Sequence, residues 1–553
     1  MNSFRSGITK KDYSLLISVF AALLIIGYVF KFVSLPQIVY SDEGDYIWTG
    51  HVITNTIREK SWSRFWQFTY PQFHYPFFQS WYLGFATLFF PYSVASSRFV
   101  SLFLLLPTII LAWLITKKLK TENVAPLLAS GLILTSPLGL FYFSNAMKEG
   151  LAACLSLLVI YTYFRGREKG KNRWFFLSSL SLLALTLTKY NYGGLILLPL
   201  AIESLVWLLK DKGYRQKKFW LNNSFLYLPF LLGFLFWLFY PTNRFGYLFP
   251  FPQANDVFNL KQTNFIGHLL FYPQALAFSY TLSWPIFLLL IFGFWQSLKN
   301  RRHYSSRLLI NFFLFNFFLA EKHIINNQAR YIFTSVPVFF ILCAAGLETN
   351  RQSLKNFGQK IRNNQFYLGV AISLIVLAGV IIAGDLFNLS RIISGAGSQN
   401  LQSAAFYEQD YRISMFDFNR RHWPKIPPPA EAEKLAAVID FALKNVDWNK
   451  NVFLVGGFDE FNRGIFDFYL NKARESLSFP VGSSLKRQFS EYFVVLRVKP
   501  GSRFETLNYR YYTKLRGIDS AAETESALKD KSLIKINEKD FPYLGLTVTI
   551  LGR

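Results

Sequence analysis

An acidic cluster at residues 40–46 (Tyr-Ser-Asp-Glu-Gly-Asp-Tyr) is the stretch of this sequence best suited to chemistry. Its carboxylates belong to Asp42, Glu43 and Asp45, in a chain of 553 residues that has 59 Lys+Arg against 33 Asp+Glu. A carboxylate can act as a general base toward a hydroxyl group, and several together can bind a hard divalent cation. Asp, Glu and Gly are also typical of a solvated turn, and the cluster alone favours neither interpretation.

The composition predicts a polytopic α-helical membrane protein. Hydrophobic residues make up 52% of the chain and charged residues 17%. The sequence contains about 11 apolar stretches that can serve as spans, since a bilayer is crossed by about 17–25 residues of helix. The formal net charge of +26 arises mainly from Lys and Arg in short loops between these stretches, which is the bias expected of cytoplasmic loops. The charge therefore indicates a membrane topology and no nucleic-acid partner.

The order of the apolar stretches predicts a topology in the plasma membrane with the N-terminus in the cytoplasm. Residues 13–33 form the first span, and residues 34–94 form a long outer loop with interfacial helices. Segment 77–90 of that loop could instead be a span. The remaining spans are predicted at 95–116, 123–143, 151–164, 174–188, 195–209, 224–240, 277–298, 308–320, 331–347 and 366–384. The segments 308–320 and 331–347 are the weakest, because they are short for a span.

A change in composition predicts a second domain after the membrane domain at residues 1–390. It follows a Gly/Ser-rich linker at 394–398, and we place it at residues 400–553 on the extracytoplasmic side. Apolar residues at helical spacing predict an amphipathic helix at 430–446. Runs of β-branched and aromatic residues predict strands at 452–455, 492–496 and 546–550. The fold class is thus a helical membrane domain followed by a soluble α/β domain.

The predicted topology brings further charged residues to the outer face, where the acidic cluster lies. They are Glu149, Lys189, His323 and Arg330, each in a different loop or at a helix end. Charges near spans are costly unless they are paired or functional, so a site between the helices is the natural inference. Two simpler interpretations stay open: the cations anchor helix ends at the headgroups, and Lys148 pairs with Glu149.

Six stretches, in order along the chain, resemble motifs of the integral-membrane glycosyltransferases with a C-type fold. The most similar group is that of the protein O-mannosyltransferases and the bacterial aminoarabinose and lipopolysaccharide-core transferases. Asp42-Glu43 followed by Tyr46 resembles their Asp-Glu-x-x-Tyr motif, and the likeness covers about residues 10–350. The other matching stretches are His74-Tyr75-Pro76-Phe77 for Lys-Pro-Pro-Leu, Arg98-Phe99 for Arg-Leu, Lys148-Glu149-Gly150 for a second acidic position, Leu187-Thr188-Lys189-Tyr190-Asn191-Tyr192-Gly193 for Leu-Thr-Lys-Gly-Pro-x-Gly, and Arg330-Tyr331-Ile332 with Pro337 for Arg-Tyr-Leu and its later Pro. His74 replaces a Lys, and Tyr190-Asn191 replaces Gly-Pro.

This resemblance implies that a sugar passes from a polyprenyl-phosphate donor to an acceptor hydroxyl, with inversion at the anomeric carbon. Such a transfer needs a base for the hydroxyl and positive charge for the departing phosphate. We expect Asp42 to be the base and Glu43 to orient it or bind a metal. We expect the donor phosphate to bind Lys189, Arg330, His74 and His323, with Asp45, Tyr46, Arg98, Glu149 and Tyr331 in support. A divalent cation, Mg or Mn, is an optional partner of Asp42 and Glu149.

Two other classes of function compete with this interpretation. A transporter or flippase also carries charges in the membrane, but typically shows internal repeats and broken spans near the bilayer centre. Here no repeat is visible, and the polar residues lie at helix ends. A non-catalytic assembly or receptor subunit is the third candidate. The sequence leaves open the sugar and the acceptor, which can be a protein, a lipid or a polysaccharide.

Overall fold

The computed structural model of the protein describes residues 42–240, 272–349, 429–455, 490–499 and 520–553, with short gaps at 71, 73–75, 120, 122–123, 211–214, 274, 282–283, 300, 302, 324–328, 448–449 and 451. The spans predicted at 13–33 and 366–384 and the linker predicted at 394–398 lie outside the described residues.

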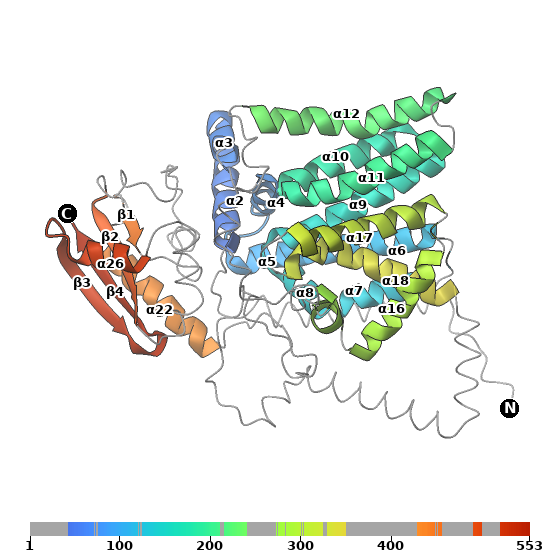
Figure 1. Ribbon diagram of the computed structural model, residues 1–553. Coiled ribbons are helices and arrows are strands. Elements are labelled where there is room, and N and C mark those ends of the chain that lie inside the picture. The colour runs from blue at the N-terminus through green and yellow to red at the C-terminus, as the bar shows by residue number, and fades with distance from the viewer. Residues whose placement is uncertain are drawn as a thin grey trace, which may run out of the picture.

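A bundle of helices forms the larger part of the molecule (Figure 1). Each predicted span between residues 95 and 347 falls on one or two helices, so the apolar pattern was sufficient to locate them. The helices are α5 (Val94–Phe103), α6 (Leu105–Lys118), α7 (Val124–Leu134), α8 (Pro137–Ser144), α9 (Lys148–Lys169), α10 (Asn172–Thr188), α11 (Tyr190–Lys210), α12 (Lys217–Phe239), α16 (Trp284–Lys299), α17 (Tyr304–His323) and α18 (Val336–Thr349), with a π-helix η4 (Ala275–Tyr280) and a 3-10 helix η5 (Ala329–Ser335).

Several bundle helices have the length and composition of membrane spans. Among the described residues, four are long and apolar enough, namely Val94–Lys118, Tyr190–Lys210, Lys217–Phe239 and Arg330–Thr349. A fifth span results if α7 and α8, which meet at a bend of 67°, are counted as one. The helix α17, predicted as a weak span, has 20 residues. At about 1.5 Å per residue this gives about 30 Å, the thickness of the hydrocarbon core.

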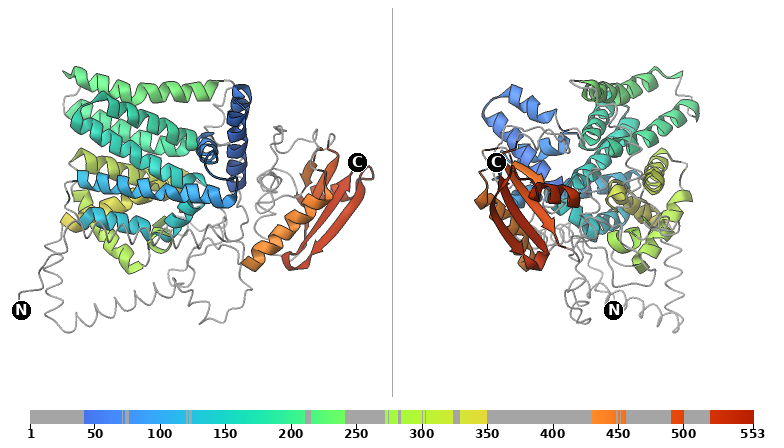
Figure 2. Two further views of the ribbon diagram at one scale, coloured as in Figure 1. Left: turned by 180° about the vertical axis from the view of Figure 1, so that it is seen from behind. Right: turned by 60° about the vertical axis from the view of Figure 1, so that its left-hand side comes forward.

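Three short helices lie across one end of the bundle, as Figures 1 and 2 show: α2 (Asp42–Arg58), α3 (Trp62–Thr69) and α4 (Phe78–Ala86). Two glycines bring α2 and α4 into direct backbone contact, because a Cβ on Gly84 would lie 2.6 Å from the carbonyl oxygen of Gly50. Nine residues make α4 about 14 Å long, too short to cross a bilayer. The interfacial position of these helices stays a prediction, and the exposed Trp62 of α3 suits it.

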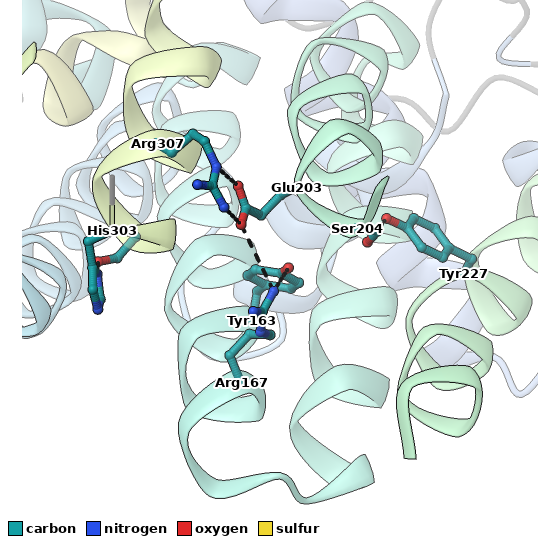
Figure 3. A network of polar contacts seen from close by, with 8 residues as sticks. Tyr163, Arg167, Glu203, Ser204, Tyr227, His303 and Arg307 are labelled. Carbon is teal, nitrogen blue, oxygen red and sulfur yellow. Dashed lines mark hydrogen bonds and ion pairs between the residues drawn. The ribbon is translucent and has the colours of Figure 1, made fainter. Parts of the chain in front are cut away.

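An ion pair with a fully buried carboxylate connects helices of the bundle at the end of α9 far from Glu149 (Figure 3). Arg307 of α17 donates two hydrogen bonds to Glu203 of α11, from Nε to Oε2 at 2.7 Å and from Nη2 to Oε1 at 2.5 Å. Arg167 of α9 lies over the ring of Trp207 at 3.9 Å and donates to the hydroxyl of Tyr163 at 3.2 Å. A buried carboxylate needs such partners, so these contacts hold α9, α11 and α17 in register.

A small sheet with two helices forms the C-terminal part. The elements are α22 (Pro429–Asn445), β1 (Val452–Val455), β2 (Tyr492–Val498), α26 (Ser520–Leu528), β3 (Ile534–Phe541) and β4 (Leu546–Gly552). The strand order is β1-β2-β4-β3, with β1 and β2 parallel and the other pairs antiparallel. The predicted helix and the three predicted strands are confirmed. The strand β3 and the helix α26 were not predicted.

Candidate active site

The carboxylate of Glu43 is held in the first turn of α2. It is fully buried and accepts hydrogen bonds from Nε of Arg98 at 2.8 Å, Nη2 of Arg98 at 2.7 Å and the backbone N–H of Ala146 at 3.0 Å. Arg98, on α5, is buried as well. The planar guanidinium matches the carboxylate with two parallel bonds, the strongest arrangement for such a pair. Three donors therefore fix Glu43, and α2 is tied to α5 and to the loop at 145–147.

The loop at 145–147 is also hydrogen-bonded to α4. The side-chain Nε2 of Gln79 donates to the carbonyl oxygens of Ala146 and Met147, at 3.1 and 3.2 Å. Lys148, the first residue of α9, places its Nζ 4.9 Å from the ring centroid of Tyr46 on α2. The start of α9 is thus determined by contacts with α2, α4 and α5. Its second residue is Glu149, which these contacts position.

Glu149, the second residue of α9, is fully buried. Its Oε1 accepts a hydrogen bond from the hydroxyl of Tyr192 at 3.2 Å. Its Oε2 is buried and has no hydrogen-bond partner among the described residues. The Tyr192 hydroxyl also lies 3.5 Å from Nζ of Lys189 and 3.5 Å from the carbonyl oxygen of Arg330. A carboxylate, an ammonium group and the backbone of Arg330, from three separate segments, therefore meet around one tyrosine.

The position of Lys189 follows from the junction between α10 and α11. Lys189 is the extended residue that ends α10, and α11 begins at the next residue. The two helices pack very tightly here, because a Cβ on Gly193 would lie 1.9 Å from Oγ1 of Thr186. The buried ammonium group lies 4.7 Å from the ring centroid of Tyr192 and 4.8 Å from that of Tyr331. Aromatic faces stabilise a desolvated cation, so the two rings are suitable neighbours for the buried ammonium group.

Most of the predicted site residues meet in this region. The structure joins Glu43, Tyr46, Arg98, Glu149, Lys189, Arg330 and Tyr331 through the contacts above. Asp42 and Asp45 lie on α2 and His323 ends α17, but their side chains are outside the described part of the chain, and so is all of His74. Of the alternatives left open, the anchoring of Lys189 and Arg98 to headgroups does not fit their burial.

Two residues with clear contacts in the site were missed from the sequence. Tyr192 lies at the variable position of the Leu187–Gly193 stretch, and Gln79 stands in no motif. A clue existed for Tyr192 only, since it lies three residues after Lys189 in the same matching stretch. Gln79 acts on a loop 67 residues away, which no local pattern indicates.

The predicted cation site stays a prediction. Within the described ranges, no three His, Cys, Asp or Glu side chains lie together as ligands. The predicted pair includes Asp42, whose side chain is outside those ranges. What the described residues can do is hold a hydroxyl group at Glu149 and an anion at Lys189 and Arg330, in a largely desolvated space.

Comparison with known proteins identifies the fold. Residues 74–240 match the family model described as dolichyl-phosphate-mannose-protein mannosyltransferase. The structure is similar to the crystal structure of ArnT from Cupriavidus metallidurans bound to undecaprenyl phosphate, with a TM-score of 0.54 and 14% identity over 98% of each chain. This chain has the C-type glycosyltransferase fold. An apo oligosaccharyltransferase structure from Archaeoglobus fulgidus shares it, with a TM-score of 0.52 and 16% identity over 93% of this chain and 72% of that one.

The C-type fold confirms the resemblance inferred from the motifs. The matched segment at 74–240 runs from the loop before α4 to the end of α12, and it includes Arg98, Glu149 and Lys189. No curated protein matched the sequence. The family match and the shared fold together indicate a membrane-embedded chain with a fold that glycosyltransferases use.

Proposed function

We propose that this protein transfers a sugar from a polyprenyl-phosphate donor to an acceptor hydroxyl at the outer face of the membrane. The observation that carries the proposal is the meeting of Glu149, Lys189 and the backbone of Arg330 at the hydroxyl of Tyr192. The acidic start of α2 is hydrogen-bonded to Ala146, in the loop just before α9 and Glu149. The undecaprenyl phosphate bound to ArnT, a protein of the same fold, supports this class of donor. The plasma membrane is the proposed location, with the C-terminal sheet on the outer side.

Asp42 is the proposed general base. Glu43 already accepts three hydrogen bonds, two from Arg98 and one from Ala146, so it has little capacity left for a substrate hydroxyl. Asp42 precedes it at the start of α2. In the proposed step, Asp42 takes the proton of the acceptor hydroxyl while the oxygen attacks the anomeric carbon from the face opposite the phosphate. The bond between carbon and phosphate oxygen breaks, and the configuration inverts.

Lys189 and Arg330 are the proposed partners of the donor phosphate. The leaving polyprenyl phosphate gains negative charge as the bond breaks, and a fixed cation in a desolvated site stabilises that charge more strongly than water does. Lys189 is buried between two tyrosine rings, so its charge is placed before the donor arrives. His74 and His323 remain proposed additional ligands, and Glu149 is proposed to bind a substrate hydroxyl.

Replacing Lys189 by Met is expected to lower kcat/KM for sugar transfer about 10²–10³-fold, the effect of removing one preorganised charge from a transition state. The assay follows release of undecaprenyl phosphate and transfer of labelled sugar, with the full-length protein in lipid nanodiscs and a panel of undecaprenyl-phosphate-linked sugars as donors. Lys210→Met is the matched control, because Lys210 is an exposed residue at the far end of α11, the helix that begins directly after Lys189.

Equal rates for the Lys189 and Lys210 variants would contradict the assignment of Lys189. Failure of the unaltered protein to release undecaprenyl phosphate from any donor in the panel would contradict the function itself. Mass spectrometry of glycolipids and glycoproteins from cells that lack the chain identifies the acceptor, because the missing sugar marks it.

A further inference from the structure

The hydroxyl of Tyr192 is the point at which the carboxylate of Glu149, the ammonium group of Lys189 and the backbone of Arg330 meet. It lies 3.2 Å from Oε1 of Glu149, 3.5 Å from Nζ of Lys189 and 3.5 Å from the carbonyl oxygen of Arg330. A phenol has one proton to donate. The nearer acceptor is the carboxylate, and a hydrogen bond to a charged group is the stronger one, so the proton goes to Glu149. The hydroxyl oxygen is then free to accept from Lys189.

The surroundings of Tyr192 leave this hydroxyl little freedom. The ring is almost fully buried in the bundle core. The next residue, Gly193, lies against Thr186 so closely that no side chain could be added there. One face of the ring carries the ammonium group of Lys189. The close packing of α11 on α10 therefore determines the position of the Tyr192 hydroxyl. The hydrogen bond from this hydroxyl in turn orients the carboxylate of Glu149.

The two oxygens of Glu149 have different surroundings. Oε1 accepts from Tyr192, whereas Oε2 is buried with no hydrogen-bond partner in the described part of the chain. A buried carboxylate oxygen is costly unless a donor satisfies it. The ammonium group of Lys189 lies over the ring of the same Tyr192, so an anionic substrate group has its place at that ammonium group and not at Oε2. A neutral donor, such as a hydroxyl of the same substrate, is the partner that fits Oε2.

We propose that Tyr192 is a positioning residue, which holds Oε1 of Glu149 so that Oε2 receives a hydroxyl group of the bound sugar donor. This inference rests on the proposed function and deepens it. Tyr192 transfers no proton to the substrate. It fixes the orientation of the residue that binds the sugar.

The test is Tyr192→Phe, which removes one oxygen atom and keeps the ring. We expect kcat for transfer to fall about 10- to 100-fold, the effect of one hydrogen bond to a charged group. Binding of undecaprenyl phosphate alone is expected to stay unchanged, since this ligand carries no sugar.

A double variant separates positioning from mere packing. If Tyr192 acts through Glu149, Tyr192→Phe combined with Glu149→Gln is expected to be no slower than Glu149→Gln alone. Tyr227→Phe is the matched control, because it also removes a tyrosine hydroxyl that is hydrogen-bonded inside the bundle, to Ser204 at 2.7 Å. We expect this control to transfer sugar at the rate of the unaltered protein.

Three results would overturn the inference: Tyr192→Phe as fast as the unaltered protein, fully additive losses in the double variant, or unfolding of Tyr192→Phe under conditions in which Tyr227→Phe is folded. In each case transfer by the unaltered protein leaves the proposed function standing. If the unaltered protein transfers no sugar from any undecaprenyl-phosphate donor, the proposed function fails and this inference fails with it.

Discussion

Replacing Arg98 by Met is expected to destabilise the protein by about 3–5 kcal/mol, because the variant leaves the fully buried carboxylate of Glu43 without its charged partner. The same pair supports the loop at 145–147, so the start of α9 and Glu149 lose their position and transfer activity is lost as well. The measurement is the midpoint of thermal unfolding in detergent at one fixed heating rate, since membrane proteins often unfold irreversibly.

Arg64→Met is the matched control for this prediction. Arg64 and Glu59 also form an arginine–glutamate ion pair, with one hydrogen bond at 2.8 Å, but their side chains are 37% and 51% exposed. Ion pairs at the surface contribute about 0–1 kcal/mol. The double variant Glu43→Gln with Arg98→Met is expected to be more stable than Arg98→Met, because it buries no unpaired charge. Equal unfolding midpoints for Arg98→Met and Arg64→Met would show that the buried pair does not hold the outer loop.

The helices of the membrane domain could be predicted from the sequence because burial in lipid or in the bundle leaves a strong local signal. A run of about 17 or more apolar residues has few alternatives to a helix in a membrane. The helix α9 shows the limit of that signal. The prediction began it at residue 151, but α9 starts at Lys148, because Lys148 and Glu149 are buried among partners from other segments that no local pattern includes.

The strand β3 was missed for a related reason. Its sequence, Ile-Lys-Ile-Asn-Glu-Lys-Asp-Phe, is mostly charged or polar, and all of its residues but the last are exposed. It lies at the edge of the sheet and pairs only with β4 among the described strands. Charged residues on an edge strand protect it from pairing with other chains, and they also remove the pattern by which strands are predicted.

The sequence predicted which charged residues come together in the candidate site, but it could not predict the contacts that each of them makes. The sidedness of the loops predicted that Glu149, Lys189 and Arg330 would meet, and they do meet around Tyr192. The sequence could not assign Glu43, which was expected to orient the base or bind a metal. Its three hydrogen bonds to Arg98 and Ala146 arise from residues 55 and 103 positions away. Only the folded chain brings such donors together.

Asp42→Asn is expected to lower kcat for sugar transfer about 10²–10⁴-fold, the contribution of a positioned general base. Asparagine is close to aspartate in size but cannot take a proton from the acceptor hydroxyl. Since the substitution leaves the pair of Glu43 and Arg98 intact, we expect the unfolding midpoint and the binding of undecaprenyl phosphate to be retained. The measurement is single-turnover transfer in nanodiscs, which reports the chemical step alone.

Asp45→Asn is the matched control for the base, because it removes a carboxylate from the same turn of α2, three residues further on. We expect its rate to fall less than 10-fold, since a neighbouring charge affects the proton transfer only through space. The two variants together separate a specific base from the general negative charge of the cluster. If Asp45→Asn loses more activity than Asp42→Asn, the base is Asp45. If both keep the rate of the unaltered protein, the proton of the acceptor leaves by another route, and Glu149 is the carboxylate to test next because its Oε2 lacks a described partner.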